Sequence, residues 1–87
     1  MKLNYTYYLR NYAGSDNVEC YQPMSEEEEA AYRAAVAAGK DPEQELAAFL
    51  DEIREGILEQ EKENFEQWGD EWDDSYEVVL YDLEWKE

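Results

Sequence analysis

The acidic residues of this chain are so numerous and so unevenly placed that they limit which surfaces its fold can bury. Of 87 residues, 24 are Asp or Glu and seven are Lys or Arg, which gives a net charge of −17. Residues 1–24 contain two acids, Asp16 and Glu19, and two bases, Lys2 and Arg10, so this segment is neutral. The excess of acids lies in residues 25–87. A small domain needs only about 2–8 net charges for solubility. The excess therefore predicts a field directed at a cationic partner.

The aromatic content argues against an acidic disordered tail. Disordered segments have few aromatic residues, whereas this chain has eight Tyr, three Trp and two Phe, and 44% of its residues are apolar. We expect a single domain over residues 1–87 with one modest core, in which the aromatic side chains make up much of the mass.

The residue types needed for most catalytic and metal sites are missing. The chain has no His and a single cysteine, Cys20, which excludes an intramolecular disulfide and leaves a zinc ion without its usual ligands. The sequence shows no catalytic nucleophile paired with a general base and no phosphate-binding loop. We therefore expect that the protein is not an enzyme, that it has no catalytic residues, and that it binds no cofactor and no metal. Without a signal peptide or a long apolar run, we expect a cytoplasmic protein.

The first 24 residues have the pattern of a β-hairpin. Leu3, Tyr5, Tyr7 and Leu9 alternate with more polar residues, as in a half-buried strand. The turn residues 13–17 and a short return strand over 18–21 follow.

Two helices are predicted after the hairpin. The first, within 25–39, has a capping box formed by Ser25 and Glu28 and ends at Gly39. The second, over 41–68, begins with Asp41 as N-cap and Pro42 in its first turn, and Gly69 ends it. Its apolar stripe is clear as far as Leu58, whereas Gln60, Glu61 and Asn64 fall where it should continue. We expect the last turns to be exposed, bent near Gly56, or placed over the rim of the core. The residues of the predicted apolar stripe are Leu46, Phe49, Leu50, Ile53 and Ile57.

A C-terminal strand is predicted over 76–85. Strict alternation places Val79, Tyr81, Leu83 and Trp85 on one face, with Val78 and Leu80 on the other. The order ββααβ indicates an α+β fold, with an antiparallel three-stranded sheet and two helices covering one face.

The solvent face of the second helix carries a row of acidic residues. At 100° per residue, the row falls within an arc of about 80° and would span roughly 40 Å if the helix were continuous. Acidic residues of the following loop extend it, and two tryptophans nearby are candidate anchors for a partner. The predicted partner-binding residues are Asp41, Glu45, Glu52, Glu55, Glu59, Glu63, Glu66, Asp70, Glu71, Asp73 and Asp74, with Trp68 and Trp72.

Three other interpretations of these acids stay open. The row is also what the solvent face of an ordinary amphipathic helix looks like. The loop 70–74 has clustered oxygens that weakly suggest calcium, although the spacing of an EF-hand is not met. Finally, the chain has the charge of an acidic adaptor or antitoxin that neutralises a basic protein unrelated to nucleic acid.

In size, charge and rows of carboxylates, the chain resembles the DNA-mimic inhibitors of phages and mobile elements, including anti-CRISPR and anti-restriction proteins. The resemblance implies inhibition by occupying the nucleic-acid groove of a host defence protein in the bacterial cytoplasm, with a CRISPR effector as the expected target. Carboxylates would pair there with the Lys and Arg that normally bind phosphate. It implies no direct binding of nucleic acid or membrane, and leaves open whether the chain forms a homodimer.

Overall fold

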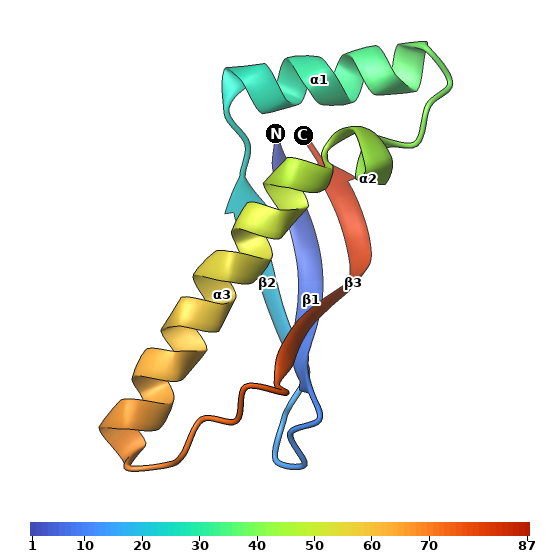
Figure 1. The fold of residues 1–87 in the computed structure, drawn as a ribbon. Helices are drawn as coiled ribbons and strands as arrows, with labels where there is room; N and C mark the ends of the chain where they lie inside the picture. Colours follow the sequence, from blue (N-terminus) through green and yellow to red (C-terminus); the bar gives the residue numbers. More distant parts are fainter.

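The N-terminal strand lies at the centre of a three-stranded antiparallel sheet with the order β2-β1-β3 (Figure 1). The computed structural model describes residues 1–87. Its elements are β1 (Lys2–Arg10), β2 (Val18–Pro23), α1 (Glu26–Ala37), α2 (Pro42–Glu45), α3 (Ala47–Trp68) and β3 (Glu77–Lys86). The predicted α+β class, the N-terminal hairpin and the C-terminal strand are confirmed.

Local capping sets the helix ends much as the sequence predicts. The Ser25 hydroxyl accepts a hydrogen bond from the Glu28 N–H, and the Glu28 carboxylate accepts one from the Ser25 N–H, which completes the capping box. Asp41 caps α2 by accepting from the Glu43 N–H. Gly39 and Gly69 have φ of 70° and 74°, the left-handed conformation that ends α1 and α3 and that glycine adopts without strain.

The prediction of one continuous helix over 41–68 is wrong. A single turn, α2, is followed by Leu46 with φ −107° and ψ 28°, and α3 begins at Ala47. α2 packs on α1 whereas α3 packs on β3, so the two segments follow different surfaces. Leu46 takes up the change of direction and is itself buried in the core.

The prediction of strict alternation along β3 is also wrong, because the strand contains a bulge. Asn4 pairs with Glu84 but Thr6 pairs with Tyr81, so Tyr5 faces two residues of β3. Asp82, inside this bulge, has a φ of 51°. The extra residue reverses the side-chain direction. Leu80, Leu83 and Trp85 consequently all pack on the core, although alternation placed Leu80 on the opposite face.

Two apolar clusters hold α3 to the sheet. The first joins Leu3 and Tyr5 of β1 to Leu46, Phe49, Leu50 and Ile53. The second is aromatic and surrounds Phe65, which is 2% exposed and packs against Tyr12, Trp72 and Tyr76. The end of α3 therefore lies over the rim of the core, where it meets the loops that flank the sheet; this is one of the three alternatives that the sequence left open.

The molecule is long and thin. It extends 47 × 20 × 19 Å with a radius of gyration of 14.7 Å, where a compact domain of this length would have about 12 Å. Figure 1 shows the reason: α3 runs obliquely along one face of the sheet, while α1 lies across the end near both chain termini. There Tyr32 of α1 stacks on Trp85 with ring centroids 5.1 Å apart. The cover over the rest of this face comes from α3.

Candidate functional site

The solvent side of α3 carries five glutamates that we call the glutamate ridge: Glu52, Glu55, Glu59, Glu63 and Glu66. All five are exposed, because the opposite side of the helix is buried against the sheet. They are three or four residues apart, so successive carboxylates rise by about 4.5 or 6 Å along the helix and the row spans about 21 Å. One strand of a nucleic-acid duplex presents a phosphate every 3.4 Å or so of axis. Compared with the phosphates of such a strand, the ridge is a shorter row of more widely spaced negative charges.

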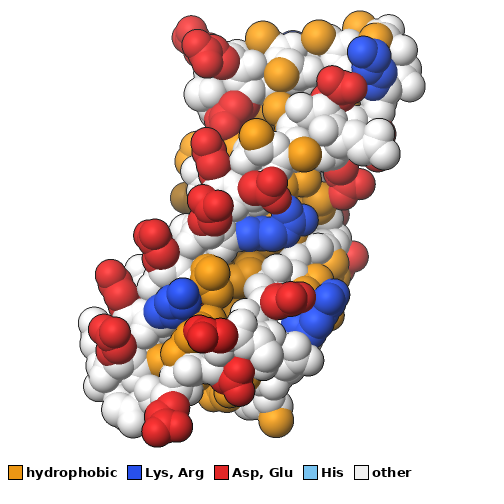
Figure 2. All heavy atoms as spheres, viewed as in Figure 1, with side chains coloured by type: hydrophobic (Ala, Val, Ile, Leu, Met, Phe, Trp, Pro, Cys, Tyr) orange, Lys and Arg blue, Asp and Glu red, His pale blue; other side chains and the backbone are white.

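No basic side chain neutralises the glutamate ridge. The ion pairs of the molecule join other carboxylates, namely Glu29, Asp51, Glu77, Glu84 and Glu87. The two basic residues of α3 are engaged elsewhere: Arg54 pairs with Asp51 at 2.9 Å, and Lys62 lies 5.8 Å above the ring of Trp72. Figure 2 shows acidic side chains in a row along the outer edge of α3. Since like charges at i,i+4 destabilise a helix slightly, this arrangement is not one that stability alone favours.

One glutamate of α3 points the other way. The Tyr7 hydroxyl donates a hydrogen bond to a Glu61 carboxylate oxygen at 2.9 Å, which links the centre of α3 to β1. Burial raises the pKa of Tyr7 far above its ordinary value, and the bond to Glu61 raises it further. Glu61 therefore has a structural role and does not belong to the ridge.

The break at Leu46 separates the first two predicted site residues from the ridge. Asp41 caps α2, and Glu45 ends that single turn, so neither continues the line of α3. Glu45 instead lines a hollow of about 210 Å³ with Glu52, Glu27 and Glu28. From the sequence, Glu28 was predicted only as part of the capping box, and Glu27 was not among the predicted partner-binding residues. Their position beside Glu52, which depends on the packing of α1, extends the acidic surface sideways at the start of the ridge.

The acidic loop, which comprises Asp70, Glu71, Asp73 and Asp74, is exposed beyond the end of α3. Asp73 accepts a hydrogen bond from the Ser75 N–H at 2.8 Å, and this bond lowers the pKa of its carboxyl group. Asp73 thus orders the turn into β3. No group of three or more acidic or cysteine side chains converges closely enough to hold a metal ion.

The two predicted tryptophan anchors differ in their surroundings. Trp72 is half-buried and packs edge-on against Phe65 and Tyr76, with ring centroids 5.1 and 5.2 Å away. Trp68 is 64% exposed, yet it lies about 180° around the helix from Glu59. Trp68 is therefore free to contact a partner, but it does not share the direction of the glutamate ridge.

Comparisons of this chain with models of known protein families, with curated proteins and with solved structures found no match. None of the helices combines the length and the apolar character that crossing a membrane requires.

Proposed function

We propose that this protein is a nucleic-acid mimic that inhibits a host defence protein by occupying its DNA- or RNA-binding groove, and that the glutamate ridge takes the place of the phosphates. The class of partner that we favour is a CRISPR effector in the bacterial cytoplasm. The observation that carries the proposal is the single-signed ridge, in which none of five exposed glutamates is paired within the fold.

Electrostatics supplies the mechanism. A groove that binds nucleic acid presents Lys and Arg side chains, and carboxylates form charge-assisted hydrogen bonds with them, bidentate where the partner is Arg. A long, thin body suits such a groove better than a sphere does, and its extents of 47 × 20 × 19 Å allow α3 to lie along it. The acidic loop and the glutamates of α1 lie at the two ends of the ridge and widen the anionic surface.

The main rival function is an acidic adaptor or antitoxin that binds a basic protein unrelated to nucleic acid. Both functions use the same surface, so charge alone does not separate them. Competition does, because only a mimic loses its partner when nucleic acid already fills the partner's groove.

The test is capture of proteins by the immobilised chain from a lysate of bacteria that carry CRISPR and restriction systems. The proposal predicts that captured nucleic-acid-binding proteins are released by added duplex DNA or by RNA. Capture of a basic protein that neither competitor releases would favour the adaptor.

Two variants with the same change in net charge make the test specific. The ridge variant carries Glu52→Lys, Glu59→Lys and Glu63→Lys; the control variant carries Asp16→Lys, Glu19→Lys and Glu87→Lys, whose acids are exposed and lie outside α3. The ridge variant should fold, since it removes the Glu55–Glu59 repulsion and changes no buried residue. It should lose the partner, whereas the control variant should retain it.

A further inference from the structure

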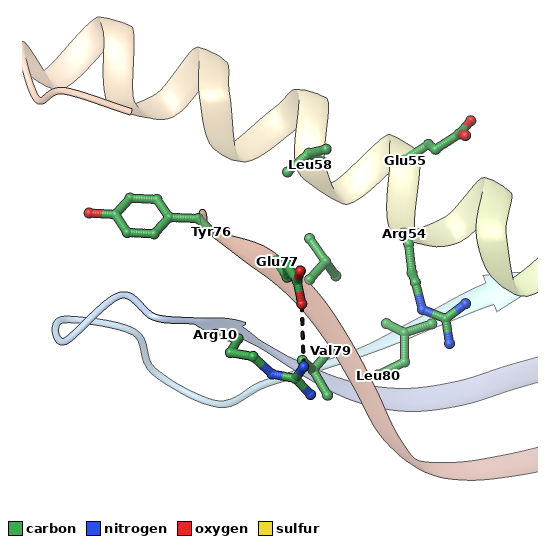
Figure 3. Close-up of a pocket in the computed structure, with 9 residues that line it drawn as sticks. Arg10, Arg54, Glu55, Leu58, Tyr76, Glu77, Val79 and Leu80 are labelled. Atoms are coloured by element: carbon green, nitrogen blue, oxygen red, sulfur yellow. Dashed lines mark hydrogen bonds and ion pairs between the residues drawn. The ribbon is translucent and has the colours of Figure 1, made fainter. Parts of the chain in front are cut away.

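A groove runs along the free edge of β3, next to α3, on the side of the molecule where β3 has no neighbouring strand. Figure 3 shows Arg54, Glu55 and Leu58 of α3 above the strand, with Arg10 below it. The volume of the groove is about 480 Å³. Val78 and Val79 both line it although their side chains point to opposite faces of the sheet, so the groove follows the strand backbone itself.

The backbone groups that face this groove have no partner within the chain. β3 pairs with β1 alone, and none of the other backbone or side-chain hydrogen bonds reaches residues 77–81 from the outer side. Over these residues the edge is apolar and half exposed, with the sequence Glu-Val-Val-Leu-Tyr. Exposed edges are commonly protected by Lys, Pro or a bulge. Here the bulge comes only at Asp82, beyond the free segment.

The groove differs from its surroundings in charge. Its charged residues are Arg10, Arg54, Glu55 and Glu77. Arg10 pairs with Glu77 and Arg54 pairs with Asp51, so Glu55 is the one unpaired charge of the groove, on a molecule whose net charge is −17. An acidic surface can approach this part of the molecule without strong local repulsion. A second copy of the chain meets that condition, because it would present the same segment of low net charge.

From the free edge, its sequence and its low local charge, we infer that β3 is a self-pairing edge, through which two copies of this chain form a two-fold dimer with a continuous six-stranded sheet. The regular segment between the start of β3 and the bulge is Glu77–Tyr81, and its middle residue is Val79. Antiparallel pairing about Val79 places Val79 opposite the same residue of the second copy. Val78 then faces Leu80 of the second copy on the core side, so apolar residues meet apolar residues.

The two-fold axis of such a dimer is perpendicular to the sheet. Both α3 helices therefore lie on one face of the joined sheet, and the two glutamate ridges run antiparallel and face the same way. The dimer itself does not depend on the proposed function. If that function holds, however, the partner meets two acidic rows in place of one.

Salt gives the dimer a signature opposite to that of partner binding. Two copies, each with a net charge of −17, repel one another outside the groove. Salt screens this repulsion beyond a Debye length of about 10 Å at 0.1 M. Dimerisation should therefore strengthen with NaCl, whereas binding of a cationic partner should weaken. Because a short edge contact buries less surface than a stable interface, we expect a dimer populated only at high protein concentration.

Sedimentation equilibrium over a concentration series, at low and high NaCl, tests the inference. We expect a monomer–dimer equilibrium that salt shifts toward dimer. Val79→Lys should abolish it by placing two ammonium groups opposite each other, while Val18→Lys on the other edge strand, β2, should dimerise as the parent does. A parent that stays monomeric at both salt concentrations would overturn the inference, as would a dimer that Val79→Lys leaves intact.

A cysteine pair keeps the test decisive if Val79→Lys does not fold. In a Cys20→Ala background, Val79→Cys should form a disulfide-linked dimer on mild oxidation, because directly opposed Cα atoms are about 4.5–5.5 Å apart. Val78→Cys should not, since its counterpart in the second copy is diagonal and roughly 8 Å away. Equal cross-linking of both variants would exclude this register. These substitutions leave the ridge unchanged, so partner binding can fail or succeed independently.

Discussion

The contact between Tyr7 and Glu61 illustrates how single residues fix the position of the acidic helix. Tyr7 lies on the central strand, and its hydroxyl is the only group of the sheet that donates a hydrogen bond to a side chain of α3. Because Glu61 is held there, the glutamates of the ridge are directed toward solvent. A residue that looks like a break in the apolar stripe is thus part of what orients α3.

Tyr7→Phe should lower the free energy of unfolding by about 1.5–3 kcal/mol at pH 7, since it removes one hydrogen bond to a charged group. The folded-state pKa of Tyr7 is raised above its ordinary value of 10.0. The folded state therefore retains a proton that the unfolded state releases, so the stability from Tyr7 is complete below about pH 10 and is lost as the pH rises further.

Chemical denaturation at pH 7 and at about pH 11 measures both effects. The parent should lose more stability between these pH values than Tyr7→Phe does, although Tyr5, whose pKa burial also raises, leaves some dependence in the variant. Tyr21→Phe, at an exposed position on β2, is the control and should follow the parent. An equal loss of stability between the two pH values in the parent and in Tyr7→Phe would show that the proton of Tyr7 does not contribute to the pH dependence of stability.

The elements were predictable from sequence where local chemistry decides them. Ser25, Asp41, Gly39 and Gly69 set helix ends through their own side chains or backbone, and each lies where its residue type predicts. The break at Leu46 was not predictable in this way. It arises because α2 and α3 pack on different elements, which no local pattern along the chain encodes.

The bulge in β3 is a second feature that alternation concealed. Leu80, Leu83 and Trp85 reach the same core only because one extra residue is inserted opposite Tyr5. The sequence offered one signal, since Asp interrupts an otherwise apolar and aromatic run at position 82. Asp adopts the left-handed conformation more readily than β-branched residues do.

Asp82→Ile should therefore destabilise the fold by about 1–3 kcal/mol, because isoleucine at a φ of 51° is strained, whereas Asp82→Gly should stay within about 1 kcal/mol of the parent. Glu84→Ile, at an exposed position of the same strand, controls for the added apolar surface. Urea unfolding of the three variants makes the comparison. Equal stability of Asp82→Ile and Glu84→Ile would mean that the bulge places no constraint on residue 82.

At the scale of the whole molecule, the sequence indicated the acidic surface but not its extent. The helical period correctly placed the five ridge glutamates on one exposed side of α3. It could not place Glu27 and Glu28 beside Glu52, because that depends on how α1 packs across the end of the sheet. The aromatic cluster around Phe65 was missed for a similar reason, since its members come from the hairpin loop, α3 and the segment between α3 and β3.

The distribution of buried and charged residues explains the elongated shape. Nine of 87 residues are buried. Ala35 lies in α1, and the other eight form a long strip along β1, Leu46 and α3, while the remaining surface holds the carboxylates apart. A rounder molecule would bury more apolar surface but would crowd these charges. In this molecule apolar burial is limited to that strip, and the solvent side of α3 presents the glutamate ridge.

The most direct test of the central claim is displacement of labelled nucleic acid from a captured partner, followed by fluorescence anisotropy as the protein is added. The account predicts that the parent and the control variant release the labelled DNA or RNA, and that the ridge variant requires at least about tenfold more protein. If the parent binds the partner while the nucleic acid stays bound, or if the ridge variant displaces it as well as the parent, the glutamate ridge does not take the place of phosphates.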